Sequence, residues 1–164
     1  MLKDRTMTKP FRAHIAAVAL AIPFLATQAS ADSERVLYAF VGHAHDGFYP
    51  TGGLIADRDG NLYGTTMAGG PNDGGVVYRL VPNAKRTTWT LETLYAFCSA
   101  SDCVDGRLPQ SDLAYAGKGS GAPYDGASPL YGTTSQAGAH HQGVVFSITA
   151  NGQSGVEQVL YNFC

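Results

Sequence analysis

Few residues in this sequence could carry chemistry, and the densest group is a short histidine-containing run. His43 and His45 precede Asp46 in the run HAHD. Alternate residues of a strand share one face, and imidazole with carboxylate is a ligand set for transition metals. The run is therefore a candidate metal site. The Asp-Gly pair at 46–47 recurs at 105–106 without the histidines, however, so we favour a turn and predict no metal or other cofactor.

Two other polar groups also have local explanations. The run Asp57 to Asn61 resembles the start of a calcium loop but lacks the later ligands, including the closing glutamate, so a hairpin turn is favoured. His140 and His141 stand in a polar loop, where paired histidines are usually surface residues. The sequence contains no nucleophile elbow, zinc-protease helix, phosphate loop or Cys-x-x-Cys motif. We identify no catalytic residues and favour a non-enzymatic role.

Three cysteines are present. Cys98 and Cys103 enclose a short polar loop, and a disulfide between them is favoured over a metal pair or two free thiols. Cys164 follows Leu-Tyr-x-Phe just as Cys98 does, and the partner expected for it would come after the last residue. It is left without a predicted intramolecular partner.

The first residues have the features of a secretory signal peptide. A basic start is followed by the apolar run 13–26 and by Ala29-Ser30-Ala31, which suits a signal peptidase. The alternative, a membrane anchor, needs about 20 apolar residues, and this run is shorter. The basic residues of the start are Lys3, Arg5, Lys9 and Arg12. We predict cleavage after Ala31 and a protein that is secreted, periplasmic or held at the cell surface.

Charge narrows the classes of partner. The whole chain has a formal net charge of −2, and the predicted signal peptide holds four of its 11 basic residues. The remainder is therefore acidic and has no basic patch. Nucleic acids and anionic membranes are unsuitable partners for such a surface. No later stretch is apolar enough to span a membrane, and we expect an unidentified glycan or protein as partner.

Internal repetition is the main signal in the sequence. Four blocks recur in the same order, and the last two share one offset. The blocks are Leu-Tyr-x-Phe at 37–40, 94–97 and 160–163; Asp-Gly-x-x-Pro at 46–50 and 105–109; Leu-Tyr-Gly-Thr-Thr at 62–66 and 130–134; and Gly-Val-Val-Tyr/Phe at 75–78 and 143–146. A longer loop from Gly117 to Ser128 in the second unit replaces a short turn in the first.

Each unit is predicted to form four antiparallel strands. Alternation places Val76, Tyr78 and Leu80 on one face, and glycine-rich turns separate the apolar runs. Repeated four-stranded units are typical of a β-propeller, whereas a β-sandwich does not require block-for-block repetition. The expected parts are a signal peptide at 1–31, a leading strand and loop at 32–51, a first blade at 52–97, a Cys-bridged loop at 98–109, and a second blade at 110–164.

The blocks resemble those of the GloVer tandem-repeat family of bacterial surface proteins. The matching residues are Asp-Gly-x-x-Pro, Gly60 to Thr66, Gly-Val-Val-Tyr/Phe, and the run from Leu94 to Gly106 with its two cysteines. The resemblance implies an exported repeat protein, commonly anchored at the cell surface, and implies no catalytic residues. The sequence departs from the family pattern in containing few repeats, and we expect no C-terminal anchor within it.

Two units raise the question of how their apolar faces are covered. A propeller closes with about 4–8 blades, and stacked repeats generally need at least three. We expect the chain to be the front of a longer repeat array; the alternative is that two-unit chains assemble into a ring, in which Cys164 could pair between chains.

The repeated aromatic residues fit packing between blades better than a sugar-binding surface. They are Tyr38, Tyr95, Tyr161, Phe40, Phe97 and Phe163. The leading hypothesis is a non-enzymatic surface or periplasmic binding or structural module. The alternative is a polysaccharide-active enzyme or lectin on a propeller scaffold, since fold does not decide between these roles.

Overall fold

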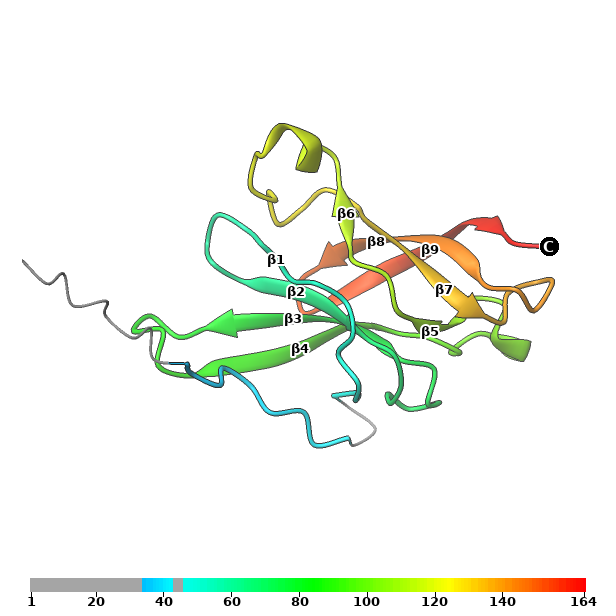
Figure 1. The fold of residues 1–164 in the computed structure, drawn as a ribbon, viewed down its shortest axis with the longest axis horizontal. Coiled ribbons are helices and arrows are strands. Elements are labelled where there is room, and N and C mark those ends of the chain that lie inside the picture. The colour runs from blue at the N-terminus through cyan, green and yellow to red at the C-terminus, as the bar shows by residue number, and fades with distance from the viewer. Residues whose placement is uncertain (1–33, 43–45) are drawn as a thin grey trace, which may run out of the picture. The chain divides into compact units, whose positions relative to one another are not determined.

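The structure is a computed structural model, and it describes residues 34–42 and 46–164 (Figure 1). The predicted signal peptide and its cleavage site lie outside the described residues, as do His43 and His45. Within the described part, Arg35–Cys164 form one compact unit. No helix among the described residues is long and apolar enough to cross a membrane.

The first sheet is a four-stranded antiparallel meander in the order β1-β2-β3-β4. Its strands are β1 (Ile55–Ala56), β2 (Leu62–Thr66), β3 (Val76–Pro82) and β4 (Trp89–Ala96). Short runs of β-branched and aromatic residues separated by Gly, Asn and Asp turns favour such a meander. The four antiparallel strands predicted for this unit are confirmed.

The second sheet has five strands. Its main order is β5-β7-β8-β9, with β6 also paired to β7. The strands are β5 (Arg107–Pro109), β6 (Ala114–Tyr115), β7 (Leu130–Gln136), β8 (Val144–Asn151) and β9 (Ser154–Asn162). Two short 3-10 turns interrupt the loops, η1 (Ser101–Cys103) and η2 (Lys118–Ser120). The fold is therefore all-β, as the sequence predicts, with two antiparallel sheets.

The two sheets have the same register at the repeated blocks. Gly64 pairs with Tyr78 in the first sheet, and Gly132 pairs with Phe146 in the second. A Cβ atom on Gly64 would lie 2.6 Å from the Tyr78 hydroxyl, and one on Gly132 would lie 2.5 Å from the Phe146 ring. Glycine is thus required because an aromatic ring of the neighbouring strand lies across it. This accounts for the repeated glycine in Leu-Tyr-Gly-Thr-Thr.

The main core lies between the sheets. One face of the first sheet packs on one face of the second, and Phe97 and Phe146 have ring centroids 4.8 Å apart in a T-shaped arrangement. Buried aromatic and aliphatic side chains of this size contribute about 1.5–3 kcal/mol each. The buried members of this core are Ile55, Tyr63, Val77, Leu94, Phe97, Leu113, Tyr124, Leu130, Val144, Phe146 and Ile148.

A second, smaller core lies on the opposite face of the first sheet. Val76, Tyr78 and Leu80 are buried there, and Tyr38 and Phe40 pack against them. The Phe40 ring lies 5.1 Å from the Tyr78 ring in a T-shaped arrangement. Residues 34–42 form no ladder with any described strand, so the leading segment is not the strand that the sequence predicts. Tyr38 and Phe40 are instead held by side-chain packing.

Candidate functional site

Asp46 takes part in a turn. Its side chain is 5% exposed, and its carboxylate accepts hydrogen bonds from the Tyr38 hydroxyl at 3.3 Å and from the Val41 backbone N–H at 2.8 Å. Burial is the largest cause that raises the pKa of Tyr38, and the neighbouring Asp46 charge adds to it. The carboxylate therefore anchors the leading segment, a role that the sequence did not predict.

Asp105 occupies the equivalent place in the second unit. It is 3% exposed, and one carboxylate oxygen accepts hydrogen bonds from the Tyr95 hydroxyl at 2.8 Å and from the Ser99 N–H at 2.9 Å. Burial, with the Asp105 carboxylate as a further cause, raises the pKa of Tyr95 well above its ordinary value. The first residue of Asp-Gly thus holds the tyrosine of the preceding Leu-Tyr-x-Phe block in both units.

The glycine of Asp-Gly also makes a repeated contact. Gly106 has a φ of +94°, and a Cβ atom there would lie 2.5 Å from the Thr134 hydroxyl oxygen. That hydroxyl accepts a hydrogen bond from the Val144 N–H at 3.0 Å. Gly47 approaches Thr66 in the same way. Asp-Gly-x-x-Pro, Leu-Tyr-Gly-Thr-Thr and Gly-Val-Val-Tyr/Phe therefore contact one another in each unit. These contacts explain the repeated residues by packing and hydrogen bonding within the fold.

A cleft of about 560 Å³ opens beside the leading segment. Its lining combines a partly exposed indole, a phenol and hydroxyl groups with the buried Asp46 carboxylate. Apolar rings accompanied by a few hydroxyl or carboxylate groups suit a ligand with alternating apolar and polar faces, such as a sugar. The lining residues are Tyr38, Asp46, Trp89, Thr90, Leu91 and Thr93.

The cysteine loop is closed by a disulfide between Cys98 and Cys103, as the sequence predicts. A shallow groove of about 540 Å³ runs beside this loop and includes His141. Cys164 is exposed and is not in a disulfide with another described cysteine. No three His, Cys, Asp or Glu side chains gather into a group that could hold a metal ion within residues 34–42 and 46–164.

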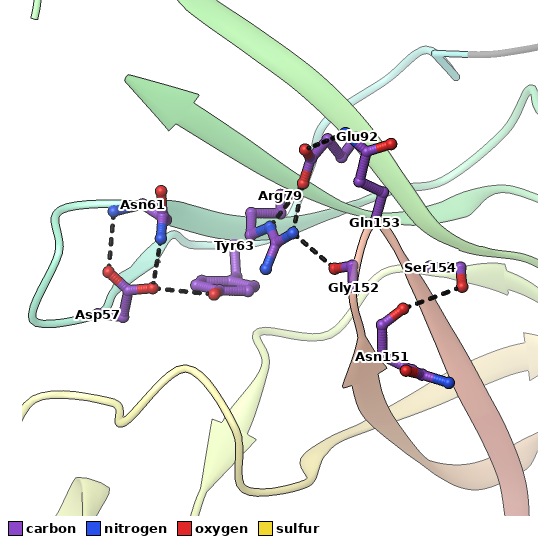
Figure 2. Close-up of polar contacts among 9 residues, drawn as sticks. All are labelled: Asp57, Asn61, Tyr63, Arg79, Glu92, Asn151, Gly152, Gln153 and Ser154. Carbon is purple, nitrogen blue, oxygen red and sulfur yellow. Dashed lines mark hydrogen bonds and ion pairs between the residues drawn. The ribbon is translucent and has the colours of Figure 1, made fainter. Parts of the chain in front are cut away.

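Asp57 organises the turn that follows β1, and Figure 2 shows its contacts with Asn61 and Tyr63. One carboxylate oxygen accepts from the backbone N–H groups of Asp59 and Asn61, each at 2.9 Å. The other accepts from the Asn61 amide at 2.7 Å and from the Tyr63 hydroxyl at 2.9 Å. Burial raises the pKa of Tyr63 to about 12. The predicted hairpin is confirmed, since backbone and side-chain donors occupy both oxygens.

Arg79 and Glu92 join the two sheets through the β8–β9 turn (Figure 2). They form an ion pair across β3 and β4, and both side chains are mostly buried. Arg79 also donates to the Gly152 carbonyl at 2.7 Å, while the Gln153 amide donates to Glu92 at 3.2 Å. Sequence reasoning missed this contact because it depends on which faces of the sheets meet.

Glu157 is the most perturbed carboxyl group between the sheets. Its Oε1 atom is buried and has no hydrogen-bond partner among the described residues. Burial, with a smaller contribution from the Asp105 charge, raises the pKa of Glu157 to about 7. It pairs with Ile148 in the register where Leu91 pairs with Leu80 in the first sheet. The sequence could have indicated this buried carboxyl group, because a glutamate stands in the second unit where the first unit has the apolar Leu91.

Comparisons with known proteins give no relative: no family model, no curated protein and no solved structure matches this chain.

Proposed function

We propose that this chain is an exported, non-enzymatic repeat module whose propeller-type units stack on one another and present loops and a cleft to a glycan. The observation that carries the proposal is the equivalence of Tyr38–Asp46 and Tyr95–Asp105. In both places the aspartate of Asp-Gly anchors the tyrosine of the preceding Leu-Tyr-x-Phe block. The motifs thus support a role in architecture and binding, with no reaction assigned to them.

Export and family membership belong to the same proposal. The basic and apolar start of the sequence and its Ala-Ser-Ala site support export. The disulfide between Cys98 and Cys103 is the kind of bond that persists in an oxidising compartment. The block pattern supports kinship with GloVer repeat proteins, whose surface location this chain would share. Mass spectrometry of the N-terminus after expression in a bacterium would test cleavage after Ala31.

The cleft beside Trp89 is the proposed binding site for a glycan. Its ring would stack on the apolar face of a sugar, and Thr90 would bond a hydroxyl group. A glycan array probed with the purified protein should give hits that weaken at least about tenfold in Trp89→Ala, because a buried aromatic contact is lost. Tyr49→Ala, which removes an exposed ring elsewhere, is the control and should bind like the parent. Binding unchanged in Trp89→Ala would refute this site.

A polysaccharide-active enzyme is the second candidate, and the raised pKa of the buried Glu157 carboxyl, to which the Asp105 charge contributes, is the observation in its favour. Glycoside hydrolysis uses two carboxyl groups, one of them with a raised pKa. Against it, Asp105 is 3% exposed and Glu157 Oε1 is buried, so neither could reach a glycosidic bond in this conformation. A turnover assay on the array hits should find no hydrolysis. Turnover that Glu157→Gln abolishes would replace the binding proposal with an enzymatic one.

A further inference from the structure

One face of the second sheet is exposed although its counterpart in the first sheet is buried. We call it the tail face; its apolar residues come from β7, β8 and β9 and from the end of the chain. They are Tyr131, Val145, Val156, Leu160, Tyr161 and Phe163. The equivalent face of the first sheet is covered by the second sheet. The contact between the two sheets therefore indicates what kind of surface would pack on the tail face.

The exposed fractions differ sharply at equivalent positions. Tyr63 is fully buried, whereas Tyr131 is 36% exposed, and Leu94 is 2% exposed, whereas Leu160 is 47% exposed. Phe97 is fully buried against Phe146, whereas its equivalent Phe163 is 37% exposed. Grouped exposed aromatic and aliphatic side chains of this kind mark an interaction surface.

The complementary surface lies at the other end of the described chain. We call it the head face; it is the side of the first sheet that carries the smaller core. Leu54 is 52% exposed there, whereas the equivalent Leu113 in the second sheet is fully buried under the first. An apolar hollow of about 330 Å³ surrounds Leu54 and includes Tyr78 and Leu80. The head face is therefore equivalent to the face of the second sheet that packs on the first sheet.

We propose that a second copy of this chain docks head-to-tail, with its head face seated on the tail face of the first. The internal contact between the sheets is the template. Tyr131 and Val145 of one copy take the places that Tyr63 and Val77 hold inside the protein. Such a contact is heterologous, because it joins two different surfaces, and it leaves a free head and a free tail for further copies or for ring closure.

In this arrangement the end of β9 from the docking copy and the leading segment would occupy the same place on the head face. Inside the protein, Phe97 of the Leu-Tyr-x-Phe block packs on Phe146, and at the head face Phe40 of the same block packs on Tyr78. Leu160–Phe163 of a docking copy would reach the same Tyr78. Residues 34–42 make no ladder pairing with a described strand, so this segment is the one that yields its place. Tyr161 would then donate to Asp46 as Tyr95 donates to Asp105.

The polar contacts predict a weaker association than the internal one. Arg79 and Glu92, which bind the β8–β9 turn inside the protein, correspond in the ladder to Ser147 and Gln158 on the tail face. The Arg79–Glu92 ion pair therefore has no counterpart on the tail face, and the contact would depend mainly on apolar burial. Apolar contacts strengthen as salt rises while ion pairs are screened, so the association should persist at high salt.

Sedimentation velocity of the purified protein tests the proposal. The weight-average mass should rise from that of one chain to at least twice that value between about 5 and about 500 µM, because an interface that is not optimised for affinity dissociates at micromolar or higher concentrations. Tyr131→Glu on the tail face and Leu54→Asp on the head face should each keep the protein monomeric. Both residues are exposed, so the fold should survive, which circular dichroism would check. Val104→Asp, on the cysteine loop, should associate like the parent.

Mixing the two monomeric variants gives the decisive result. Each keeps one intact surface, so an equimolar mixture should form a one-to-one heterodimer that neither variant forms alone. A parent protein that stays monomeric at all concentrations overturns the proposal. So does association that Tyr131→Glu abolishes and Leu54→Asp leaves intact, because two tail faces would then be pairing with each other. Sedimentation is measured without glycan, because the proposed glycan cleft is lined by Tyr38 and Asp46 and so overlaps the place that the docking copy would take.

Discussion

The two sheets have the same backbone plan and different surroundings. In both, an aspartate from Asp-Gly holds a tyrosine, and an aromatic ring lies across the glycine of Leu-Tyr-Gly-Thr-Thr. The first sheet is covered by the second sheet on one face and partly by the leading segment on the other. It carries the Arg79–Glu92 ion pair where the second sheet carries Ser147 and Gln158. The repeated residues thus build each sheet, and the residues between them decide how strongly the next unit is held.

The largest expected effect distinguishes two equivalent phenylalanines. Phe97→Ala should lower the free energy of unfolding by about 3–5 kcal/mol, since it removes a fully buried ring that packs on Phe146. Phe163→Ala should cost less than about 1 kcal/mol, because that ring is partly exposed. Urea unfolding at a protein concentration low enough to keep it monomeric measures both. Equal losses would contradict the contrast between the covered and the open face.

The glycines of Asp-Gly test the equivalence of the units. Gly106→Ala should lower the free energy of unfolding by about 2–4 kcal/mol, because a Cβ atom would meet the Thr134 and Val144 side chains at a positive φ. Gly47→Ala should cost a similar amount against Thr66. Gly121→Ala is the matched control: it has a positive φ and nothing within 4 Å, so it should cost about 1–2 kcal/mol. Thermal or urea unfolding of the three variants separates steric contact from backbone strain.

The tyrosine anchors give a smaller contrast. Tyr95→Phe should lower the free energy of unfolding by about 1.5–3 kcal/mol, because it removes a hydrogen bond to the buried Asp105 carboxylate. Tyr161→Phe should have an effect near zero, since that tyrosine is 54% exposed. Urea titration of both variants at pH 7 provides the comparison. A large loss at Tyr161 would mean that its hydroxyl has a partner in solution.

The smallest effect concerns Glu157, which stands where the first sheet has Leu91. Its folded pKa is raised to about 7 from the ordinary 4.5, chiefly by burial and then by Asp105. The protonated form is therefore the one the fold favours. The contribution of protonated Glu157 to the free energy of unfolding is fully present below the unfolded pKa and is lost as pH rises through about 7.

Glu157→Gln should consequently stabilise the protein at pH 8 by about 1 kcal/mol and have little effect at pH 4, with the gain kept modest by the partial exposure of the side chain. Urea titrations at several pH values between these limits measure the difference. Glu34→Gln, at an exposed position, is the control and should show no pH-dependent change. A gain of the same size at pH 4 and pH 8 would show that charge on Glu157 is not the cause.

Sequence patterning alone predicted the four strands of the first sheet, the Asp57 turn and the disulfide, but it missed β5, which lies in the stretch 98–109 predicted to be a Cys-bridged loop. Alternation in Val76, Tyr78 and Leu80 and glycine-rich breaks are local properties, and local properties determine where a strand begins and ends. The Asp57 turn and the Cys98–Cys103 bridge close over a few residues, so short-range spacing was enough to find them. The repeated aromatic residues were correctly assigned to packing at Phe97.

Tertiary structure decided everything that depends on which faces meet. Arg79 donates a hydrogen bond to Gly152, and the Asp105 charge contributes to the raised pKa of the buried Glu157. Both effects depend on which face of the first sheet packs on which face of the second. The leading segment carries the same Leu-Tyr-x-Phe block as β4 yet forms no strand, because the described chain gives it no neighbouring strand to pair with. The same block therefore buries Phe97 and leaves Phe163 partly exposed. Burial depends on the surface that packs against the block, and the sequence of the block does not specify that surface.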